Sequence, residues 1–410
     1  MSEWDHVAIG GALKLTSGFP FPSSLFSEEE GVPLIRIRDI VRSNIETRYL
    51  GKYAPSYLVR RGDVLIGMDG DFNVVRWRNE DALLNQRVLK IEVADRSIVD
   101  LDFAFYWLAP YIEKVNTATA ATTVKHLSIK DVKKAVGRIP GVVAQRKIAA
   151  ILTSVDNAIE ASEELIEKHQ QIKAGLMHDL FNRGVLRTGL LRPSCGEAPN
   201  LYVRSPLGHI PVDWSVKALD DLCSLIVDCP HSTPVFQESG VLVARTMHIK
   251  SGQFLEDEAS RVSEREYQQR IERGAPQAGD LIFTREAPVG EAFVVPDGMR
   301  LCLGQRVMLI RPLTGCLEPT YLLHQLYSGS LSSQIRDRTA GTTNPHLNVA
   351  DVRRLLVPVP PLAEQAAIAS SLSSMTQRIL ADQQILKKLR MQKQGLMQDL
   401  LTGKVPVRAD

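Results

Sequence analysis

Two segments of the chain carry apolar residues at intervals of mostly four and three, with polar residues between them. This spacing places the apolar side chains in one narrow stripe along a long helix, as in the seam of a coiled coil. In residues 360–404 the stripe consists of Ile368, Leu372, Met375, Ile379, Leu386, Leu389 and Leu396. In residues 140–184 it consists of Ile148, Leu152, Val155, Ile159, Ile166 and Leu176.

The two segments are copies of each other. Gln145 aligns with Gln365, 220 residues further on and without a gap, and both copies end in Gly-Leu-Met-x-Asp-Leu. A helix from Gln145 to Leu180 would be roughly 54 Å long, which is too long to be stable in water without a partner. One stripe alone would also fit a core helix of an ordinary bundle. The second copy favours an antiparallel pairing of the two helices.

The regions before the two helices are repeated as well. Residues 62–66, GDVLI, resemble residues 279–283, GDLIF, and Gln86-Arg87-Val88 resembles Gln305-Arg306-Val307. The whole chain is therefore interpreted as a tandem duplication of a domain followed by a helix. The expected parts are a first domain (1–139), a first helical spacer (140–184), a linker (185–205), a second domain (206–359) and a second helical spacer (360–404).

Each domain contains short β-rich runs bounded by glycine and polar residues, and one amphipathic helical stretch. Residues 88–93 and 307–312 are such runs, and residues 102–115 and 319–335 are the helical stretches. The predicted fold class is α+β: two quasi-repeated α/β domains, each with a curved antiparallel sheet, separated by two long antiparallel helices that form a coiled coil.

Composition limits the possible partners only weakly. The formal net charge of the 410 residues is +2, so charge alone does not indicate a nucleic-acid partner. The five cysteines include no Cys-x-x-Cys pair, which favours neither a disulfide framework nor a zinc site, and we expect no metal. The sequence begins without a signal peptide and has no stretch near the ~20 apolar residues that span a bilayer. We therefore expect a cytoplasmic protein without a membrane partner.

Several short motifs recur in the same order in both halves. They are GDLI at residues 279–282, Gly304-Gln305, Thr342 with His346-Leu347, and the run from Pro360-Pro361 through Glu364-Gln365 to Ile368. In this order they closely resemble the specificity subunits of type I restriction-modification systems, over nearly all of the chain. The first copy departs from the pattern at Gly141 and Ala144, which replace a proline and the glutamate. These changes weaken the start of the helix without changing the assignment.

The resemblance implies a DNA-binding scaffold with no catalytic residues and no cofactor of its own. Each domain would be a target recognition domain that reads one half of a bipartite site on double-stranded DNA, and the helices would set the distance between the halves. Two methyltransferase subunits would dock on the helices, and a complete system would add restriction subunits. S-adenosylmethionine, ATP and Mg are expected on these partners. The alternatives are a coiled-coil adaptor that binds only proteins, or an inactive remnant of such a system.

Enzyme classes find little support in the sequence. Asn344-Pro345-His346-Leu347 matches the Asn/Asp-Pro-Pro-Tyr/Phe segment of amino-methyltransferases at only two of four positions. There is no GxxxxGK[ST] loop for ATP and no glycine-rich turn suited to S-adenosylmethionine. Pro296-Asp297 lacks the following Glu-x-Lys of a metal nuclease.

Polar residues that differ between the two domains are the candidates for reading bases. Arginine pairs with guanine, asparagine with adenine, and a carboxylate accepts from cytosine, while basic side chains also bind phosphates. Each residue taken singly also fits an ordinary solvated surface charge. The candidates after the GD-hydrophobic strand are Asp69, Asp71, Asn73, Arg76 and Arg78 in the first domain and Thr284, Arg285 and Glu286 in the second. Those on earlier strands are Arg36, Arg38, Arg245, His248 and Lys250.

A second group of candidates is repeated in both domains. Its members precede a short predicted helix, where small donors bind phosphate or cap a turn. They are Thr122, Thr123, Lys125 and His126, matched by Thr342, Thr343, Asn344 and His346. Gln86-Arg87 and Gln305-Arg306 recur without change. At these pairs we therefore expect contacts with the DNA backbone that both domains share, or bonds within the protein framework, rather than the reading of bases.

Overall fold

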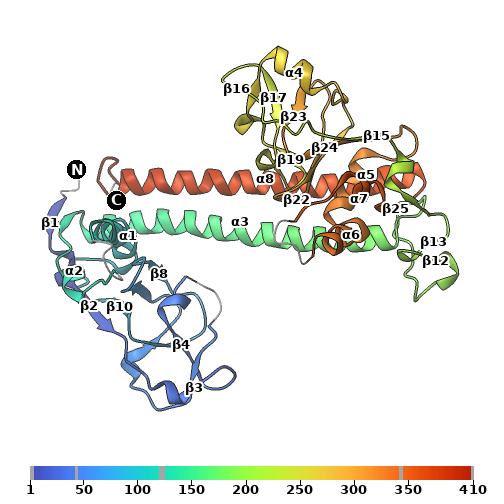
Figure 1. Ribbon diagram of the computed structural model, residues 1–410. Coiled ribbons are helices and arrows are strands. Elements are labelled where there is room, and N and C mark those ends of the chain that lie inside the picture. The colour runs from blue at the N-terminus through green and yellow to red at the C-terminus, as the bar shows by residue number, and fades with distance from the viewer. Residues whose placement is uncertain (1–3, 42–44, 120–124, 341–344, 408–410) are drawn as a thin grey trace. The chain divides into compact units, whose positions relative to one another are not determined.

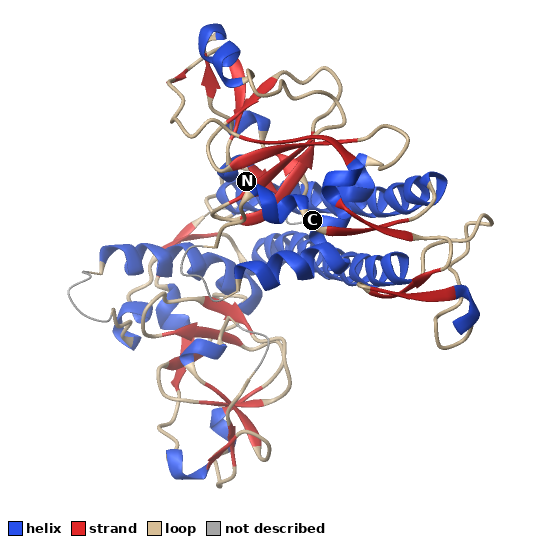
Figure 2. Cartoon of the chain, turned by 45° about the vertical axis from the view of Figure 1, so that its right-hand side comes forward, coloured by secondary structure: helices blue, strands red, loops and turns tan. Residues whose placement is uncertain are grey.

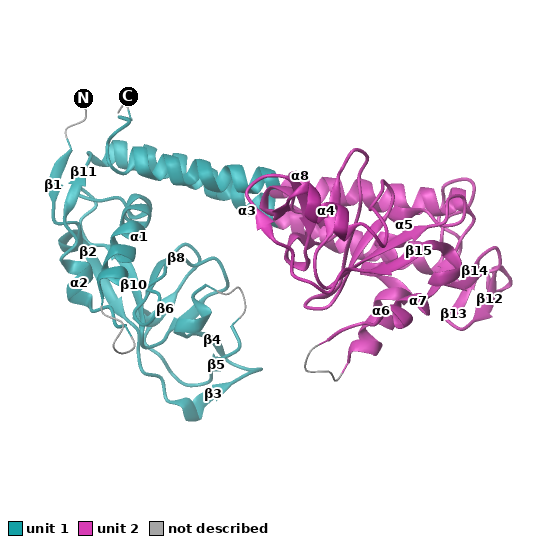
Figure 3. Cartoon of the chain, turned by 45° about the horizontal axis from the view of Figure 1, so that its top comes forward, with its two compact units in different colours: residues 1–163, 384–410 teal, residues 164–383 magenta. Residues whose placement is uncertain are grey.

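The chain divides into two compact units (Figure 3). The structure, a computed structural model, describes residues 4–41, 45–119, 125–340 and 345–407. Unit 1 comprises residues 1–163 and 384–410, and unit 2 comprises residues 164–383. The long helices α3 (Val142–Asn182) and α8 (Leu362–Leu400) are shared: each of them contributes one part to unit 1 and the other part to unit 2.

Unit 1 contains a mixed α/β domain with three sheets (Figures 1 and 2). One sheet has the order β2-β10-β7-β8, a second has the order β3-β5-β4-β9-β6, and β1 pairs with β11. The strands are β1 (Asp5–Val7), β2 (Leu13–Ser17), β3 (Phe26–Ser27), β4 (Val32–Ile35), β5 (Arg48–Tyr49), β6 (Leu58–Val59), β7 (Val64–Gly67), β8 (Val74–Arg76), β9 (Ala82–Leu84), β10 (Val88–Val93) and β11 (Gly137–Ile139). The helices of the domain are α1 (Leu101–Ala118) and α2 (Ile129–Lys133).

Unit 2 repeats this framework. Its sheet β15-β24-β21-β22 follows the same chain order as β2-β10-β7-β8, and a second sheet has the order β16-β20-β17-β23. Three two-stranded pairs, β12-β13, β14-β25 and β18-β19, complete the strands. The first strands are β12 (Tyr202–Ser205), β13 (Gly208–Pro211), β14 (Ser215–Ala218), β15 (Cys223–Asp228), β16 (Phe236–Gln237), β17 (Val241–Ala244) and β18 (Ile249–Lys250). The others are β19 (Gln253–Phe254), β20 (Arg261–Val262), β21 (Leu281–Arg285), β22 (Val289–Val294), β23 (Leu301–Leu303), β24 (Val307–Pro312) and β25 (Leu356–Val359). The helices are α4 (Glu264–Arg270), α5 (Pro319–Tyr327), α6 (Gly329–Thr339) and α7 (Val349–Arg353).

The second sheet of each domain differs from the expected antiparallel arrangement. Leu34 in β4 pairs in parallel with Leu83 in β9, and Leu242 in β17 pairs in parallel with Leu301 in β23. These strands lie far apart in the sequence, and their side chains are buried on both faces, so the runs show no alternation that would reveal the direction of pairing. The α+β class itself is as predicted.

The antiparallel course of α3 and α8 is visible inside each unit. In unit 1, Asp156 pairs with Lys393 at 2.7 Å. Glu163, which lies further along α3, pairs at 2.7 Å with Arg390, which lies earlier on α8. In unit 2, His169 Nδ1 lies 2.8 Å from Asp382 Oδ2, and the amide of the later residue Val185 donates to the earlier residue Glu364 at 2.8 Å. Residues that follow one another on α3 therefore meet residues in reverse order on α8.

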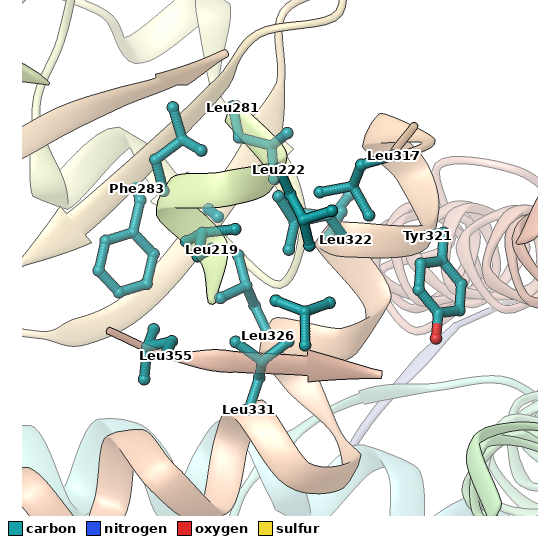
Figure 4. Packing of buried hydrophobic residues seen from close by; sticks show 14 of the residues in the cluster. Leu219, Leu222, Leu281, Phe283, Leu317, Tyr321, Leu322, Leu326, Leu331 and Leu355 are labelled. Carbon is teal, nitrogen blue, oxygen red and sulfur yellow. The ribbon is translucent and has the colours of Figure 1, made fainter. Parts of the chain in front are cut away.

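The predicted seam residues are all buried or half-buried in the structure. Ile148, Leu152, Ile166, Ile368, Leu372 and Ile379 are buried, and Val155, Ile159, Leu176, Met375, Leu386, Leu389 and Leu396 are half-buried. The most buried members join domain cores: Leu152 packs in the core of unit 1, and Leu372 in the core of unit 2. Figure 4 shows the latter core, in which Leu219, Leu222 and Leu322 lie between Phe283 and Tyr321.

A repeated glutamine attaches each long helix to its domain. Gln145 Oε1 accepts from the Asp100 amide at 2.8 Å, while its Nε2 donates to the carbonyls of Ile98 and Pro140 at 2.9 and 2.8 Å. Gln365 repeats the pattern with the Glu318 amide and the carbonyls of Cys316 and Pro360, at 2.9, 3.1 and 2.9 Å. Asp100 and Glu318 are the N-caps of α1 and α5. The glutamine thus joins the start of a long helix to the start of a domain helix.

Each long helix is followed by a glycine in the left-handed conformation that packs against a tryptophan. Gly184, with φ +65°, follows α3, and Gly403, with φ +75°, follows α8. A Cβ atom at Gly184 would lie 2.6 Å from the Trp214 ring, and one at Gly403 would lie 2.7 Å from the Trp4 ring. Both positions therefore require glycine for their backbone and for space.

In the described part of the chain, no helix combines the length and the apolar character needed to cross a membrane.

Candidate nucleic-acid interface

Three loop segments meet at one end of the four-stranded sheet in each domain. In unit 1, the Leu127 amide donates to the Met68 carbonyl at 2.7 Å, and the Met68 amide donates to the Arg87 carbonyl at 2.9 Å. These bonds join the end of β7, the turn between β9 and β10, and the segment before α2. In unit 2, the Leu347 amide donates to the Arg285 carbonyl at 2.9 Å, and the Arg285 amide donates to the Arg306 carbonyl at 3.0 Å. The same backbone frame is therefore built twice.

Charged side chains gather on this frame in unit 1. His126 Nδ1 lies 2.7 Å from Asp69 Oδ1, and Arg87 Nε lies 3.5 Å from Asp69 Oδ2. Arg87 Nη1 is 3.4 Å from the same imidazole nitrogen. The side chains of Arg87 and His126 remain 54% and 45% exposed, so the cluster is open to a ligand.

Unit 2 builds a related cluster with additional charges. Arg306 Nε lies 3.5 Å from Glu286 Oε2, and Glu286 forms a β-bridge with His346, as Asp69 does with His126. Arg285, which stands where unit 1 has Met68, pairs with Glu286 at 3.2 Å and with Asp228 at 2.9 Å. The Arg285 side chain is only 12% exposed, whereas that of Arg306 is 57% exposed. We call these two groups the Arg-His-carboxylate clusters: Asp69, Arg87 and His126 in unit 1, and Glu286, Arg306 and His346 in unit 2.

The other candidates of the first domain do not join this cluster. Arg76 pairs with Asp102 at 2.7 Å and Arg78 pairs with Glu160, and both arginines line a groove of about 480 Å³ beside α3. Arg38 pairs with Glu46 at 3.4 Å on a separate loop, and Lys125 donates to the Asn116 carbonyl at 2.8 Å. Among the remaining candidates, Asn73 and Asp71 are exposed and Arg36 is half-buried.

Two candidates of the second domain are corrected by their burial. Thr284 is completely buried in β21, and its hydroxyl accepts from the Glu291 amide at 2.9 Å. His248 is 2% exposed, with Nδ1 3.4 Å from the Val243 carbonyl, and burial lowers the pKa of its imidazole. Both side chains are held inside by the packing of their own strand or turn, so neither presents a donor at the surface. Neither therefore remains a candidate for contacting DNA.

The remaining candidates of the second domain stay accessible. Arg245 is half-buried, with its guanidinium carbon 4.9 Å from the Phe236 ring centroid, and Lys250 is exposed. Five of the predicted residues lie outside the described part of the chain: Thr122, Thr123, Thr342, Thr343 and Asn344.

The structure adds two residues that the candidate set from the sequence lacks. Arg87 and Arg306 both have left-handed backbone conformations, with φ +74° and +65°. Such conformations are uncommon for residues other than glycine, asparagine and aspartate. The signal in the sequence was the Gln-Arg pair that recurs unchanged in both domains.

Comparison with known proteins identifies the family. Residues 1–171 and 211–391 both match the type I restriction modification DNA specificity domain. The chain belongs to this family of type I specificity subunits. The two matched regions include the two domains, each with its Arg-His-carboxylate cluster, so the family's specificity domain occurs twice in the chain.

Relatives from bacteria and archaea extend over most of the chain. The EcoBI specificity subunit of Escherichia coli is 28% identical over 377 residues, which cover 89% of this chain and 78% of that protein. The MjaVIII specificity subunit of Methanocaldococcus jannaschii is 23% identical over 412 residues, which cover 99% and 94%. The crystal structure of a type I S subunit from M. genitalium has a TM-score of 0.66, with 15% identity, over 97% of this chain and 96% of that chain. The last comparison shows a shared specificity-subunit fold.

Proposed function

We propose that this type I specificity subunit is a non-catalytic, sequence-specific DNA-binding subunit in which each domain reads one half of a bipartite target. The observation that carries the proposal is the double match to the DNA specificity domain, on residues 1–171 and 211–391. The two domains share a backbone frame but differ in the residues around it, as at Met68 and Arg285. A shared frame with different surface residues is what two different half-sites require.

The accessible polar residues are the proposed sequence readers. Arg38, Asn73, Arg245 and Lys250 keep exposed or half-exposed side chains of the types that contact bases or phosphates. Arg36 and Lys125 are half-buried and are proposed as supporting contacts, as are Arg76 and Arg78, which are tied to carboxylates at the helix groove. The threonine pairs at residues 122–123 and 342–343 are proposed to contact DNA phosphates.

The long helices are proposed to set the spacing of the half-sites and to carry the partner subunits. A helix of 41 residues, such as α3, is about 60 Å long, which exceeds the ~34 Å repeat of DNA. Ile151, Leu165 and Ile172 recur on α3 at multiples of seven residues outside the seam, and they are 39%, 42% and 43% exposed. We propose that these exposed apolar side chains contribute to the contacts with partner subunits. We propose that two methyltransferase subunits, and in a complete system restriction subunits, assemble with the chain.

Methylation mapping tests the proposal. A methylation-free host would express the chain together with the methyltransferase encoded beside it, and its genome would be sequenced by a single-molecule method that detects modified bases. A bipartite motif with one modified adenine in each half is the expected result. An intact complex that modifies no motif would contradict the proposal and favour a protein-binding adaptor or an inactive system.

A further inference from the structure

Arginine occupies a strained backbone position at the same place in both domains. Arg87 and Arg306 each form the second residue of the turn that enters the long central strand, β10 or β24, with φ +74° and +65°. Glycine or asparagine would adopt this conformation at lower cost. Strain that persists in two domains whose other loops differ is a reason to look for a role of the side chain itself.

The side chains at these positions are fixed and yet accessible. Each guanidinium is held through its Nε by a carboxylate, Asp69 or Glu286, at 3.5 Å in both units. More than half of each arginine side chain is nevertheless exposed, 54% in Arg87 and 57% in Arg306. A guanidinium held at one edge loses little conformational freedom when its remaining donors bind an anion.

The duplication indicates what kind of ligand the clusters take. Two domains that read different half-sites meet different bases, but both meet the same sugar-phosphate backbone. An arginine that occupies the same place in both domains is therefore suited to the constant part of DNA. Arginine matches that part, because its planar fork binds the oxygens of a phosphate in a bidentate manner.

We propose that the Arg-His-carboxylate clusters are a duplicated pair of phosphate clamps, in which Arg87 and Arg306 each bind one DNA phosphodiester and so fix the register of their domain on the duplex. The inference rests on the proposed DNA-reading function. The carboxylate positions the guanidinium through Nε. In unit 1, His126 in turn holds the carboxylate from the segment that precedes α2, and in unit 2 His346 is joined to Glu286 by a β-bridge. The surrounding residues that differ between the domains then read the bases from a common starting position.

The salt dependence of DNA binding tests the clamps. The full-length chain, alone and in complex with its methyltransferase, would be titrated onto a fluorescent mixed-sequence duplex, and onto the same duplex carrying the mapped motif, across a series of NaCl concentrations. Arg87→Ala and Arg306→Ala should each reduce the slope of log K against log salt by about one, equally on both duplexes, and the double variant by about two. Arg96→Ala is the matched control, because Arg96 is an exposed arginine beyond the other end of β10, and its slope should equal that of the wild type.

Two further variants separate the clamp from its alternatives. Arg87→Gly relieves the backbone strain, so the clamp predicts a melting temperature no lower than that of the wild type together with a reduced salt slope. A lower melting temperature with an unchanged slope would show a purely structural arginine and overturn the inference. Arg87→Lys keeps a positive charge and should retain the slope, whereas a selective loss of affinity for the motif duplex would indicate base reading and also overturn it.

The test distinguishes this inference from the function on which it rests. A wild-type chain that binds neither duplex at any salt concentration would refute both. A wild-type chain that binds with a steep salt dependence, while Arg87→Ala and Arg306→Ala keep the same slope, would refute the clamps alone.

Discussion

The buried glutamine that joins each long helix to its domain should be one of the most sensitive positions of the chain. Gln145 is completely buried and satisfies three backbone groups: the Asp100 amide and the carbonyls of Ile98 and Pro140. Gln145→Ala leaves all three without a partner. A hydrogen bond contributes about 1 kcal/mol net, and a buried group left unsatisfied costs about 1–3 kcal/mol. We therefore expect Gln145→Ala to lower the free energy of unfolding of unit 1 by about 3–5 kcal/mol.

Hydrogen exchange with mass spectrometry resolves this effect by location. Gln145→Ala should accelerate exchange at the start of α1, around Asp100, and Gln365→Ala should do the same at the start of α5, around Glu318. Urea unfolding of the same variants would give the magnitude. Gln171→Ala is a suitable control, because Gln171 is exposed and its side-chain amide donates to Glu167 at 3.3 Å, a pair that contributes less than about 0.5 kcal/mol. A loss below about 1 kcal/mol for Gln145→Ala, or faster exchange only at distant sites, would refute the reasoning.

Three further predictions concern the helices and a buried histidine. Leu372 is completely buried in the core of unit 2, so Leu372→Ala should cost about 2–5 kcal/mol in chemical denaturation, whereas the 64% exposed Met391 should tolerate alanine. Deleting one heptad from each long helix shortens both helices by about 10 Å, which corresponds to about three base pairs of DNA. Methylation mapping should then show a target with a spacer shorter by about three base pairs and with both half-sites unchanged. An unchanged spacer would show that the helices do not set the spacing of the half-sites. Burial, helped by the charge of Lys173, lowers the pKa of His324 from 6.5 to about 4. Below pH 6.5 this histidine is protonated in the unfolded chain, whereas in the folded chain it stays neutral down to about pH 4. The free energy of unfolding of unit 2 should therefore fall by about 1.4 kcal/mol for each pH unit as the pH is lowered from 6.5 to 4. His324→Gln should remove this loss, and an unaltered pH profile of its urea midpoint would contradict the assignment.

The periodic features of the fold could be predicted from the sequence because they are local. The seam positions follow from the spacing of apolar residues alone, and the duplication follows from aligned motifs such as Gln145 and Gln365. What those glutamines do could not be seen, because the helix N-caps that they bind, Asp100 and Glu318, lie 45 and 47 residues away in the chain. The parallel pairs, such as Leu34 with Leu83, are likewise non-local, and their strands carry no directional signal.

The candidate site was less predictable because exposure decides it. Thr284 and His248 are polar residues near predicted loops, but the strand and the turn that contain them direct both side chains inward. Arg87 and Arg306 were visible as a repeat, yet their left-handed backbone and their carboxylate partners appear only in three dimensions. Sequence patterns therefore indicate the segments of the candidate site, and packing decides which of their side chains remain accessible.

The division of the chain also has a consequence for its synthesis. Unit 2 is one continuous segment, residues 164–383, whereas the core of unit 1 includes Leu400 at the end of α8 and the following Leu401, and Leu396 of α8 packs against it. On a ribosome, the N-terminal domain is made first but cannot complete its core until these final residues have emerged. The middle of the protein should therefore mature before its beginning, and truncations at the C-terminus should injure the N-terminal domain first.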